Sequence, residues 1–443
     1  MSMVKIVNFQ ISANKMKKIN IALVGLGQIG NYLMNELNKK KKDIEIKTGK
    51  RINIVAISAK SINKKRKFRI NKKIFYKNPL NIFNSKKIDI LFECIGLSDG
   101  VSKKIVELAL KKKIHVITPN KALISKHGDY LSKLAENNKV NLEFEASVAG
   151  GIPILRTIKE GLATNKINKV YGILNGTCNY ILSEMEISKE SFSNVLKRAQ
   201  KLGYAEPGNP KLDLNGYDAL AKIRILSSLS FNKKISKQKC LMEGIENIEF
   251  KDIEIANQLN FRIKLLGITE LINNKLFERV HPCLIKKDSY IANVSGVMNA
   301  VILHGEPVGE NVLQGEGAGP GATSSALMSD LLSILRGNIK FPFGVSIKKR
   351  KSISSYDSNK YSNSLYLRFE VNDKPGVLSQ ITQSLAKKNI SVERLIQIPD
   401  HKNKKASIII ITHKTNELDA NKCLKLFNTN RNILKIPTRI RLF

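Results

Sequence analysis

The chain has 443 residues, enough for two or three domains, and its 42% hydrophobic content is typical of proteins with ordinary buried cores. No apolar run reaches the ~18 residues of a membrane span, the N-terminus lacks a secretory-signal pattern, and the five scattered cysteines form no CxxC pair, so we expect no membrane partner and a cytoplasmic location. The net charge of +38 comes from lysines spread along the whole chain without interleaved aromatic residues, which favours a compositional bias over specific nucleic-acid binding.

The first third of the chain alternates strand-like and helical patterns. Apolar residues recur at helical spacing at Ile29, Leu33, Met34 and Leu37, and again over 101–112. Short apolar runs typical of strands lie at 19–24, 52–57, 88–95, 114–117 and 141–145. Because strands that alternate with helices form parallel sheets through right-handed crossovers, this part predicts a Rossmann-type doubly wound sheet of the α/β class.

A glycine-rich turn joins the first predicted strand to the first predicted helix. It reads Gly25-Leu26-Gly27-Gln28-Ile29-Gly30, which matches GxGxxG in the strand–turn–helix context that makes this pattern informative. The first glycine allows the tight turn, the second lets a pyrophosphate approach the backbone, and the third lets helix and strand pack closely. These six residues are predicted to bind a dinucleotide; the alternative is a purely structural turn.

The end of the second strand bears on the choice between NAD and NADP. The sequence Ile57-Ser58-Ala59-Lys60-Ser61 offers no Asp or Glu for the ribose 2′-hydroxyl of NAD. Lys60 is instead placed to receive a 2′-phosphate, and Lys64, Lys65 and Arg66 add positive charge nearby. We therefore expect NADP, with NAD use left open.

Two segments after later strands carry further candidate site residues. Lys121 follows the run 114–117, and the carboxyl ends of parallel strands are where such folds bind ligands, so this lysine is a candidate for contact with cofactor or substrate. Glu145 begins a stretch of small residues that ends at Pro153. One carboxylate with several carbonyls suits a hard cation, although composition alone favours a hinge.

The pattern changes to an α+β arrangement after residue 150. Helical patterns at 153–162, 192–202 and 218–229 mix with strand-like runs near 170–174 and 290–303. A glycine-rich segment at 315–321 precedes a helical pattern at 323–336, and the Lys- and Ser-rich stretch 347–363 is typical of a linker. Residues 364–443 follow the order βαββαβ, which predicts an independent ferredoxin-like domain.

The stretch 203–222 gathers four charged side chains in a loop that runs into a helix. They are Glu206, Asp213, Asp218 and Lys222. Asp218 and Lys222 are four residues apart, so on a helix they share one face and can meet. An ammonium beside carboxylates suits the binding of an amino acid and proton transfer to an alcohol oxygen.

Taken together, the sequence resembles homoserine dehydrogenase from about residue 17 to the end. The resemblance rests on Thr-Pro-Asn-Lys-Ala-Leu (118–123), Glu-Ala-Ser-Val-Ala-Gly-Gly-Ile-Pro (145–153), Leu-Asn-Gly-Thr-Cys-Asn-Tyr-Ile-Leu (174–182), the stretch 203–222, and Gly317-Ala318-Gly319. The segment Asp373-Lys374-Pro375-Gly376-Val377-Leu378 is similar to an ACT domain, a small-molecule regulatory module.

The resemblance implies a reaction and a role for each motif residue. The reaction is the reversible, NAD(P)-dependent interconversion of L-homoserine and L-aspartate 4-semialdehyde, in the biosynthesis of threonine, methionine and isoleucine. Lys222 is implied as proton donor and acceptor, Lys121 as a second active-site lysine near the nicotinamide, and Asp218 as the residue that orients Lys222. The remaining implied roles are substrate binding by Glu206 and Asp213, a nicotinamide border formed by Gly317 and Gly319, and a structural sodium site at Glu145, Val148, Gly150 and Ile152.

The resemblance also implies a domain organisation and partners. We expect a cofactor domain at 17–150, a substrate-binding and dimerisation domain at 151–314, a return segment at 315–346, a linker at 347–363 and an ACT domain at 364–443. L-Threonine is the implied effector, near 372–376, in a homodimer or homotetramer. The alternatives are another nicotinamide-dependent dehydrogenase with a regulatory tail, which would need a His–carboxylate pair, and a basic nucleic-acid-binding protein.

Overall fold

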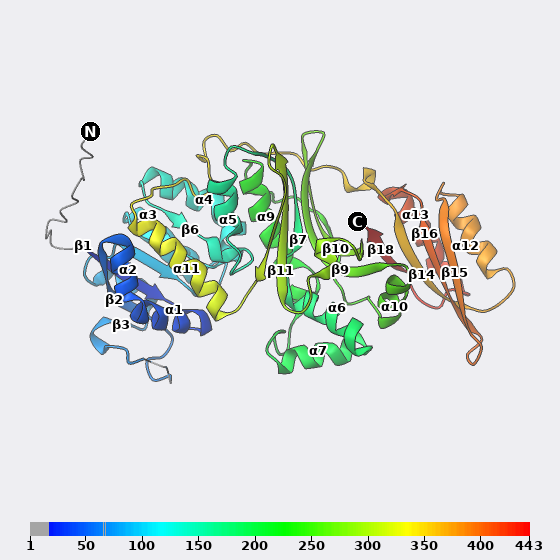
Figure 1. Ribbon diagram of the computed structural model, residues 1–443, viewed down its shortest axis with the longest axis horizontal. Coiled ribbons are helices and arrows are strands. Elements are labelled where there is room, and N and C mark those ends of the chain that lie inside the picture. The colour runs from blue at the N-terminus through cyan, green and yellow to red at the C-terminus, as the bar shows by residue number, and fades with distance from the viewer. Residues whose placement is uncertain (1–16, 65, 67) are drawn as a thin grey trace, which may run out of the picture. The chain divides into compact units, whose positions relative to one another are not determined.

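The structure is a computed structural model that describes residues 17–64, 66 and 68–443 (Figure 1). Contacts divide the chain into two compact units. The first unit consists of the described residues up to Ser147 together with Gly319–Pro342. The second unit consists of Val148–Ala318 together with Phe343–Phe443. None of the described helices is long and apolar enough to cross a membrane.

The first unit contains a six-stranded parallel sheet, as predicted from the alternation of strands and helices. The strands are arranged in the order β3-β2-β1-β4-β5-β6, which is the doubly wound order with a reversal between β1 and β4. The strands are β1 (Lys17–Val24), β2 (Lys50–Ser58), β3 (Phe75–Tyr76), β4 (Ile90–Glu93), β5 (His115–Ile117) and β6 (Leu142–Glu143). The helices are α1 (Gln28–Lys39), α2 (Lys41–Thr48), α3 (Val101–Lys111), α4 (Lys121–Asn137) and α11 (Pro320–Leu335).

The core of the first unit explains why its central strands are apolar without alternation. Leu23 of β1 and Phe92 of β4 are fully buried, because helices cover both faces of a parallel sheet. Helix α11 packs on α1 in Figure 1 and adds Leu327 and Leu331 to the same cluster. The chain therefore returns to this unit more than 170 residues after leaving it.

The second unit is built on a ten-stranded mixed sheet. Its path is β12-β11-β7-β9-β10-β18-β14-β16-β15, and β8 pairs with β10 off this path. The strands before residue 320 are β7 (Lys166–Ile173), β8 (Leu241–Met242), β9 (Phe261–Ile272), β10 (Lys275–Lys286), β11 (Met298–Glu306) and β12 (Gly309–Glu316). The helices are α5 (Ile154–Arg156), which continues as a π-helical turn over Thr157–Gly161, α6 (Gly176–Ser188), α7 (Phe192–Lys201), α8 (Lys211–Leu214), α9 (Tyr217–Ser230) and α10 (Phe250–Gln258).

The C-terminal part of the second unit is the predicted ferredoxin-like module. Its antiparallel sheet has the order β18-β14-β16-β15 and carries a core of its own that includes Phe369 and Phe427. The elements are β14 (Leu365–Asn372), α12 (Val377–Ala386), β15 (Val392–Asp400), β16 (Lys405–Thr412), α13 (Glu417–Leu426) and β18 (Thr438–Leu442), with a short pair β13 (Ser362–Asn363) and β17 (Thr415–Asn416). Because β18 pairs in parallel with β10, one sheet runs through both parts of this unit.

One expected element differs from the observed structure. The expected strand at 290–303 is wrong over its first half, where Tyr290–Asn293 is a 3-10 helix and a turn with positive φ at Gly296 precedes β11. The stretch 347–363 lies along the second unit through isolated bridges from Lys351 to Lys233 and from Ser355 to Leu276.

Candidate active site

Helix α9 presents Lys222 and Asp218 on one face, as their spacing predicts. The ammonium nitrogen of Lys222 donates to Oδ2 of Asp218 (2.8 Å) and to the carbonyl of Leu174 (2.6 Å). Both side chains are nearly buried, with 9% of each exposed. An ammonium has three N–H donors, so two of them hold Lys222 in place and the third is left for a further acceptor.

Asn175 joins two carboxylates that lie on different elements. Its amide nitrogen donates to Oδ1 of Asp213 (2.8 Å) and to Oδ2 of Asp218 (3.0 Å). Its amide oxygen accepts from the backbone N–H of Cys178 and so caps α6. The sequence analysis quoted Asn175 only as part of a motif. The signal in the sequence was an asparagine at the start of a helix. When its amide oxygen caps the helix, its two amide N–H donors can bind other acceptors.

The carboxylates also influence the buried thiol beside them. Burial, reinforced by the negative charges of Asp213 and Asp218, raises the pKa of Cys178 well above its ordinary value. The thiol is therefore protonated, and it donates to the carbonyl of Asp213 (3.3 Å). Cys178 thus acts as a packing and hydrogen-bonding residue at this site rather than as a nucleophile.

The structure does not bring Glu206 into this group. Glu206 lies on an exposed loop, and its carbonyl accepts from the side chain of Gln200 (3.3 Å). The carboxylates that Asn175 binds at this site are those of Asp213 and Asp218.

The glycine-rich turn of the first unit has the geometry of a dinucleotide site. Gly25 has a φ of +92°, and a Cβ there would lie 2.5 Å from the carbonyl of Cys94. A Cβ on Gly30 would lie 1.9 Å from the carbonyl oxygen of Gly25, so helix and strand pack too closely for any side chain. Gly27 has open space where its Cβ would be, as a position that a pyrophosphate approaches must have.

A cavity of about 610 Å³ lies over this turn. Its walls are the turn itself, the loop after β4 and the segment after β2. The basic residues that line it are Lys60, Lys64, Arg66 and Lys77. Arg66 donates to the carbonyls of Ser61, Ile62 and Lys64, so its guanidinium braces the loop that carries Lys60. Of the cofactor residues predicted from sequence, Gly25, Leu26, Gly27 and Lys60 line this cavity, whereas Lys121, Gly317 and Gly319 do not. Lys65, named beside Lys60, lies outside the described residues.

Glu93 organises the carboxyl edge of the sheet and was missed by the sequence analysis. It ends β4 with a fully buried carboxylate that accepts from Thr118 (2.6 Å), from Asn120 (3.3 Å) and from the backbone N–H of Ile95 (2.8 Å). Asn120 in turn caps α4, which begins at Lys121. A carboxylate at the end of an otherwise apolar strand was the signal in the sequence, since a buried charge requires partners.

The predicted sodium and nicotinamide-border residues divide between the two units. Glu145 is buried in the first unit, whereas Val148, Gly150 and Ile152 begin the second. Gly317 packs so closely on the Asn299 side chain that a Cβ would lie 2.0 Å from its amide carbon. Gly319, with a φ of +106°, immediately precedes α11. These glycines are required by the backbone, and their ligand roles stay predictions.

Comparisons with known proteins agree with this geometry. Family models match at residues 25–145 ("Homoserine dehydrogenase, NAD binding domain"), 153–332 ("Homoserine dehydrogenase") and 365–428 ("ACT domain"). Homoserine dehydrogenase of Neisseria gonorrhoeae is 39% identical over 91% of this chain and 93% of its own length. The crystal structure of a homoserine dehydrogenase from Thiobacillus denitrificans is 34% identical, covers 97% of this chain and 99% of its own, and gives a TM-score of 0.88. A hyperthermophilic archaeal homoserine dehydrogenase mutant in complex with NADPH is 22% identical, covers 71% of this chain and 97% of its own, and shares the fold with a TM-score of 0.58.

Proposed function

The chain belongs to the homoserine dehydrogenase family, and we propose that Lys222 is the residue that exchanges the proton in its reaction. The reaction interconverts L-homoserine and L-aspartate 4-semialdehyde. The observation that carries the proposal is the ammonium of Lys222, held by Asp218 and by the carbonyl of Leu174 with one donor left over. When bound, the reduced nicotinamide supplies the hydride.

In the direction of reduction, the third N–H of Lys222 donates to the aldehyde oxygen of the substrate. This polarises the carbonyl, and the proton moves to the oxygen as negative charge develops there. In the reverse direction the neutral amine accepts the proton of the hydroxyl group. Asp218 keeps the amine directed at that oxygen, because its Oδ2 fixes one N–H while Leu174 fixes another.

Asp213 and Glu206 bind the ammonium group of the substrate in this proposal. Asp213 is held by Asn175 and lies beside the first turn of α6, where Thr177 also approaches its Oδ2 (3.4 Å). Glu206 lies on the exposed loop ahead of α8, so its participation requires this loop to close over the substrate. Substrate binding is thus expected to order the loop that carries Glu206.

The first unit provides the NAD(P) site, and we propose that NADP is the preferred cofactor. The support is chemical: Lys60, Lys64 and Arg66 line the cavity at the end of β2, and no acidic residue stands at Ser58–Ser61 to accept a ribose 2′-hydroxyl. Lys121 contributes beside the nicotinamide because it begins α4 at the carboxyl edge of the sheet. Gly317 and Gly319 border the nicotinamide, and Glu145 with the carbonyls of Val148, Gly150 and Ile152 binds a structural sodium ion.

The C-terminal module binds the regulatory ligand in this proposal, and L-threonine is the effector. A cavity of about 400 Å³ at the start of α12 is lined by 371–378, Gln397 and Ile408, and it includes the stretch 372–376 at which the family resemblance implies the effector. The assembly is a homodimer or homotetramer. Light scattering on the purified chain measures the subunit number, and the initial rate over a range of threonine concentrations tests the effector.

The proposed function is tested by the loss of NADPH absorbance when aspartate 4-semialdehyde is added to the purified full-length protein. We expect turnover that depends on this aldehyde and is absent with 2-keto acids. Turnover of a 2-keto acid alone would support a hydroxy-acid dehydrogenase. Salt-dependent binding to duplex DNA without any turnover would support the nucleic-acid alternative.

A further inference from the structure

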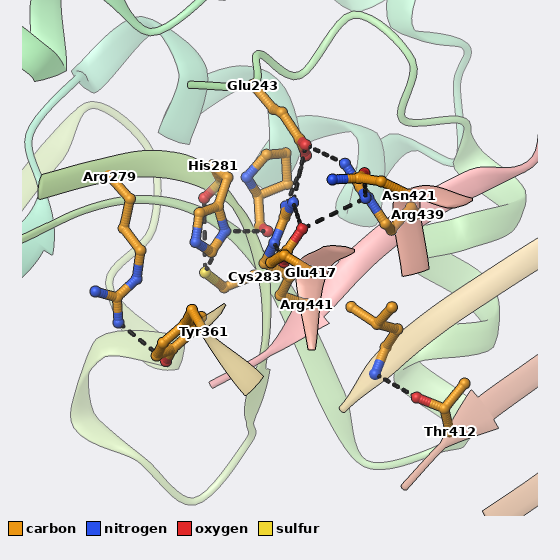
Figure 2. A network of polar contacts seen from close by, with 12 residues as sticks. Glu243, Arg279, His281, Cys283, Tyr361, Thr412, Glu417, Asn421, Arg439 and Arg441 are labelled. Atoms are coloured by element: carbon orange, nitrogen blue, oxygen red, sulfur yellow. Dashed lines mark hydrogen bonds and ion pairs between the residues drawn. The ribbon is translucent and has the colours of Figure 1, made fainter. Parts of the chain in front are cut away.

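Two arginines and two glutamates form one of the junctions between the C-terminal module and the rest of the second unit (Figure 2). Arg439 and Arg441 lie on β18. Glu417 is the first residue of α13 in the same module, whereas Glu243 directly follows β8, in the part that carries the candidate active site. Glu243 is therefore the member of this group that ties the module to the substrate-binding part.

The bonds of Glu243 are charged and mostly buried. Arg441, which is fully buried, donates to both carboxylate oxygens of Glu243 (2.7 and 2.9 Å), and Arg439 donates to one of them (2.6 Å). Glu417 pairs with the same two arginines. Although burial alone would raise the pKa of Glu243, its hydrogen bonds and charge interactions with Arg441 and Arg439 lower it to about 2. Bidentate pairs of this kind fix geometry as well as charge.

The backbone after Glu243 touches the elements that carry the site. Ile245 donates its N–H to the carbonyl of Leu214, the last residue of α8 (3.0 Å). A Cβ on Gly244 would lie 2.2 Å from the same carbonyl oxygen, so the two backbones are in direct contact. Gly216, which precedes α9, packs against the side chains of Val280 and Met242. The segment 243–245 thus supports the turn between Asp213 and Asp218.

We propose that Glu243 is a positioning residue, which anchors segment 243–245 to β18 of the C-terminal module and thereby holds Asp213 in register for the substrate. The inference rests on the proposed role of Asp213 in substrate binding. It provides a continuous route from the module to the site: Arg441 and Arg439, Glu243, the backbone of 244–245, Leu214 and Asp213. In this proposal, a shift of β18 relative to β10 moves segment 243–245 and so changes its backbone contacts with Leu214 at the end of α8.

The surroundings of the junction leave room for such movement. A cavity of about 520 Å³ borders it, lined by Glu243, Gly244, Asn421 and the segment 435–439. Arg439 therefore faces open space on one side, although Asn421 and Glu417 bind its Nη1 on the other. Displacement of this arginine does not require the cores on either side to repack.

The test compares Glu243→Gln with a matched control in the full-length protein. Glu249→Gln removes a carboxylate from the same loop, one that pairs with Arg368 and Lys435 of the module but caps α10 instead of contacting α8. For Glu243→Gln we expect the KM for aspartate 4-semialdehyde to rise about tenfold, with kcat and the KM for NADPH changed less than about threefold. Amide hydrogen exchange over 211–216 should accelerate in this variant and not in Glu249→Gln.

Arg439→Gln provides a second, milder variant, because Arg439 is more exposed than Arg441 and the fold tolerates its loss better. It should raise the same KM in the same direction, and it carries the test if Glu243→Gln does not fold. Equal KM values in Glu243→Gln and Glu249→Gln, or faster exchange without a change of KM, would overturn the proposal. Loss of turnover on Lys222→Ala bears on the proposed function alone and is separate from this result.

Discussion

The ammonium nitrogen of Lys222 lies 2.8 Å from Oδ2 of Asp218, one turn earlier on α9. The same carboxylate oxygen accepts from Asn175, which begins α6 and also holds Asp213. A basic group, two carboxylates and a helix start are thereby held in one network of charged hydrogen bonds. Substitution of any one of these residues is therefore expected to change the orientation of the remaining N–H donors, which themselves stay in place.

Asp218→Asn is expected to lower kcat about tenfold to a hundredfold, because Lys222 loses the charged acceptor that directs its third N–H. The KM for NADPH should not change, since the glycine-rich turn and Lys60 lie in the first unit, away from α9 in the sequence. Steady-state kinetics with NADPH and aspartate 4-semialdehyde measures both quantities. Asp213→Asn is the matched control: it should mainly raise the KM for the aldehyde. A kcat within about twofold of the native value for Asp218→Asn would contradict the orienting role.

The roles of the second and third glycines of the turn can be separated by alanine substitutions. Gly27→Ala is expected to fold normally, because nothing lies within 4 Å of the added Cβ, and to weaken NADPH binding about tenfold or more. Gly30→Ala is expected to destabilise the fold by several kcal/mol, because its Cβ would lie 1.9 Å from the Gly25 carbonyl oxygen. NADPH fluorescence titration and thermal unfolding measure the two effects. Equal thermal stability of the two variants would show that the close packing at Gly30 is not required.

Lys60→Ala is expected to reduce the preference for NADPH over NADH about tenfold, measured as the ratio of the two kcat/KM values. The physical reason is the loss of an ammonium from the wall of the cofactor cavity at the end of β2. Lys86→Ala, an exposed lysine that lines a different cavity, serves as the control for net charge. An unchanged ratio in Lys60→Ala would remove this residue from the 2′-phosphate site.

Lys264 predicts a specific dependence of stability on pH. It is buried on β9, where its ammonium donates to the carbonyl of Val294 (2.6 Å) and to Asn179 (3.1 Å). Burial lowers the pKa of Lys264 to about 8, against the opposing charge of Glu186 and with a smaller contribution from Arg262. In the unfolded chain this pKa is about 10.4, so between about pH 8 and 10.4 the unfolded state binds more protons than the folded state.

The titration of Lys264 is therefore expected to raise the free energy of unfolding by about 3 kcal/mol in total between about pH 8 and 10.4. Lys264→Met should lack it, whereas Lys275→Met, at the exposed start of β10, should retain it. Urea unfolding at several pH values between about 7 and 10 measures the difference. Parallel pH curves for the native chain and Lys264→Met would show that Lys264 titrates normally.

The parts of the fold that follow from local patterns could be predicted. Alternating apolar runs and helices around GxGxxG gave the parallel sheet, and the four-residue spacing of Asp218 and Lys222 gave their contact on α9. Both depend on periodicity within one element or on short right-handed crossovers.

Contacts between distant segments could not be predicted in this way. Asn175 binds carboxylates 38 and 43 residues away, and Arg441 binds Glu243 across 198 residues. The pairing of β18 with β10 involves only two residue pairs, so no run of apolar residues signals it. Such contacts form only when the second unit is packed, because each donor binds an acceptor that is distant in the sequence.

The most direct test of the central claim is the turnover number of Lys222→Ala with NADPH and aspartate 4-semialdehyde. The account predicts a fall in kcat of at least about a hundredfold, with an unchanged affinity for NADPH and cooperative thermal unfolding as evidence of an intact fold. Turnover near the native value in a folded, cofactor-binding Lys222→Ala protein would contradict it, and would move the proton transfer to another group.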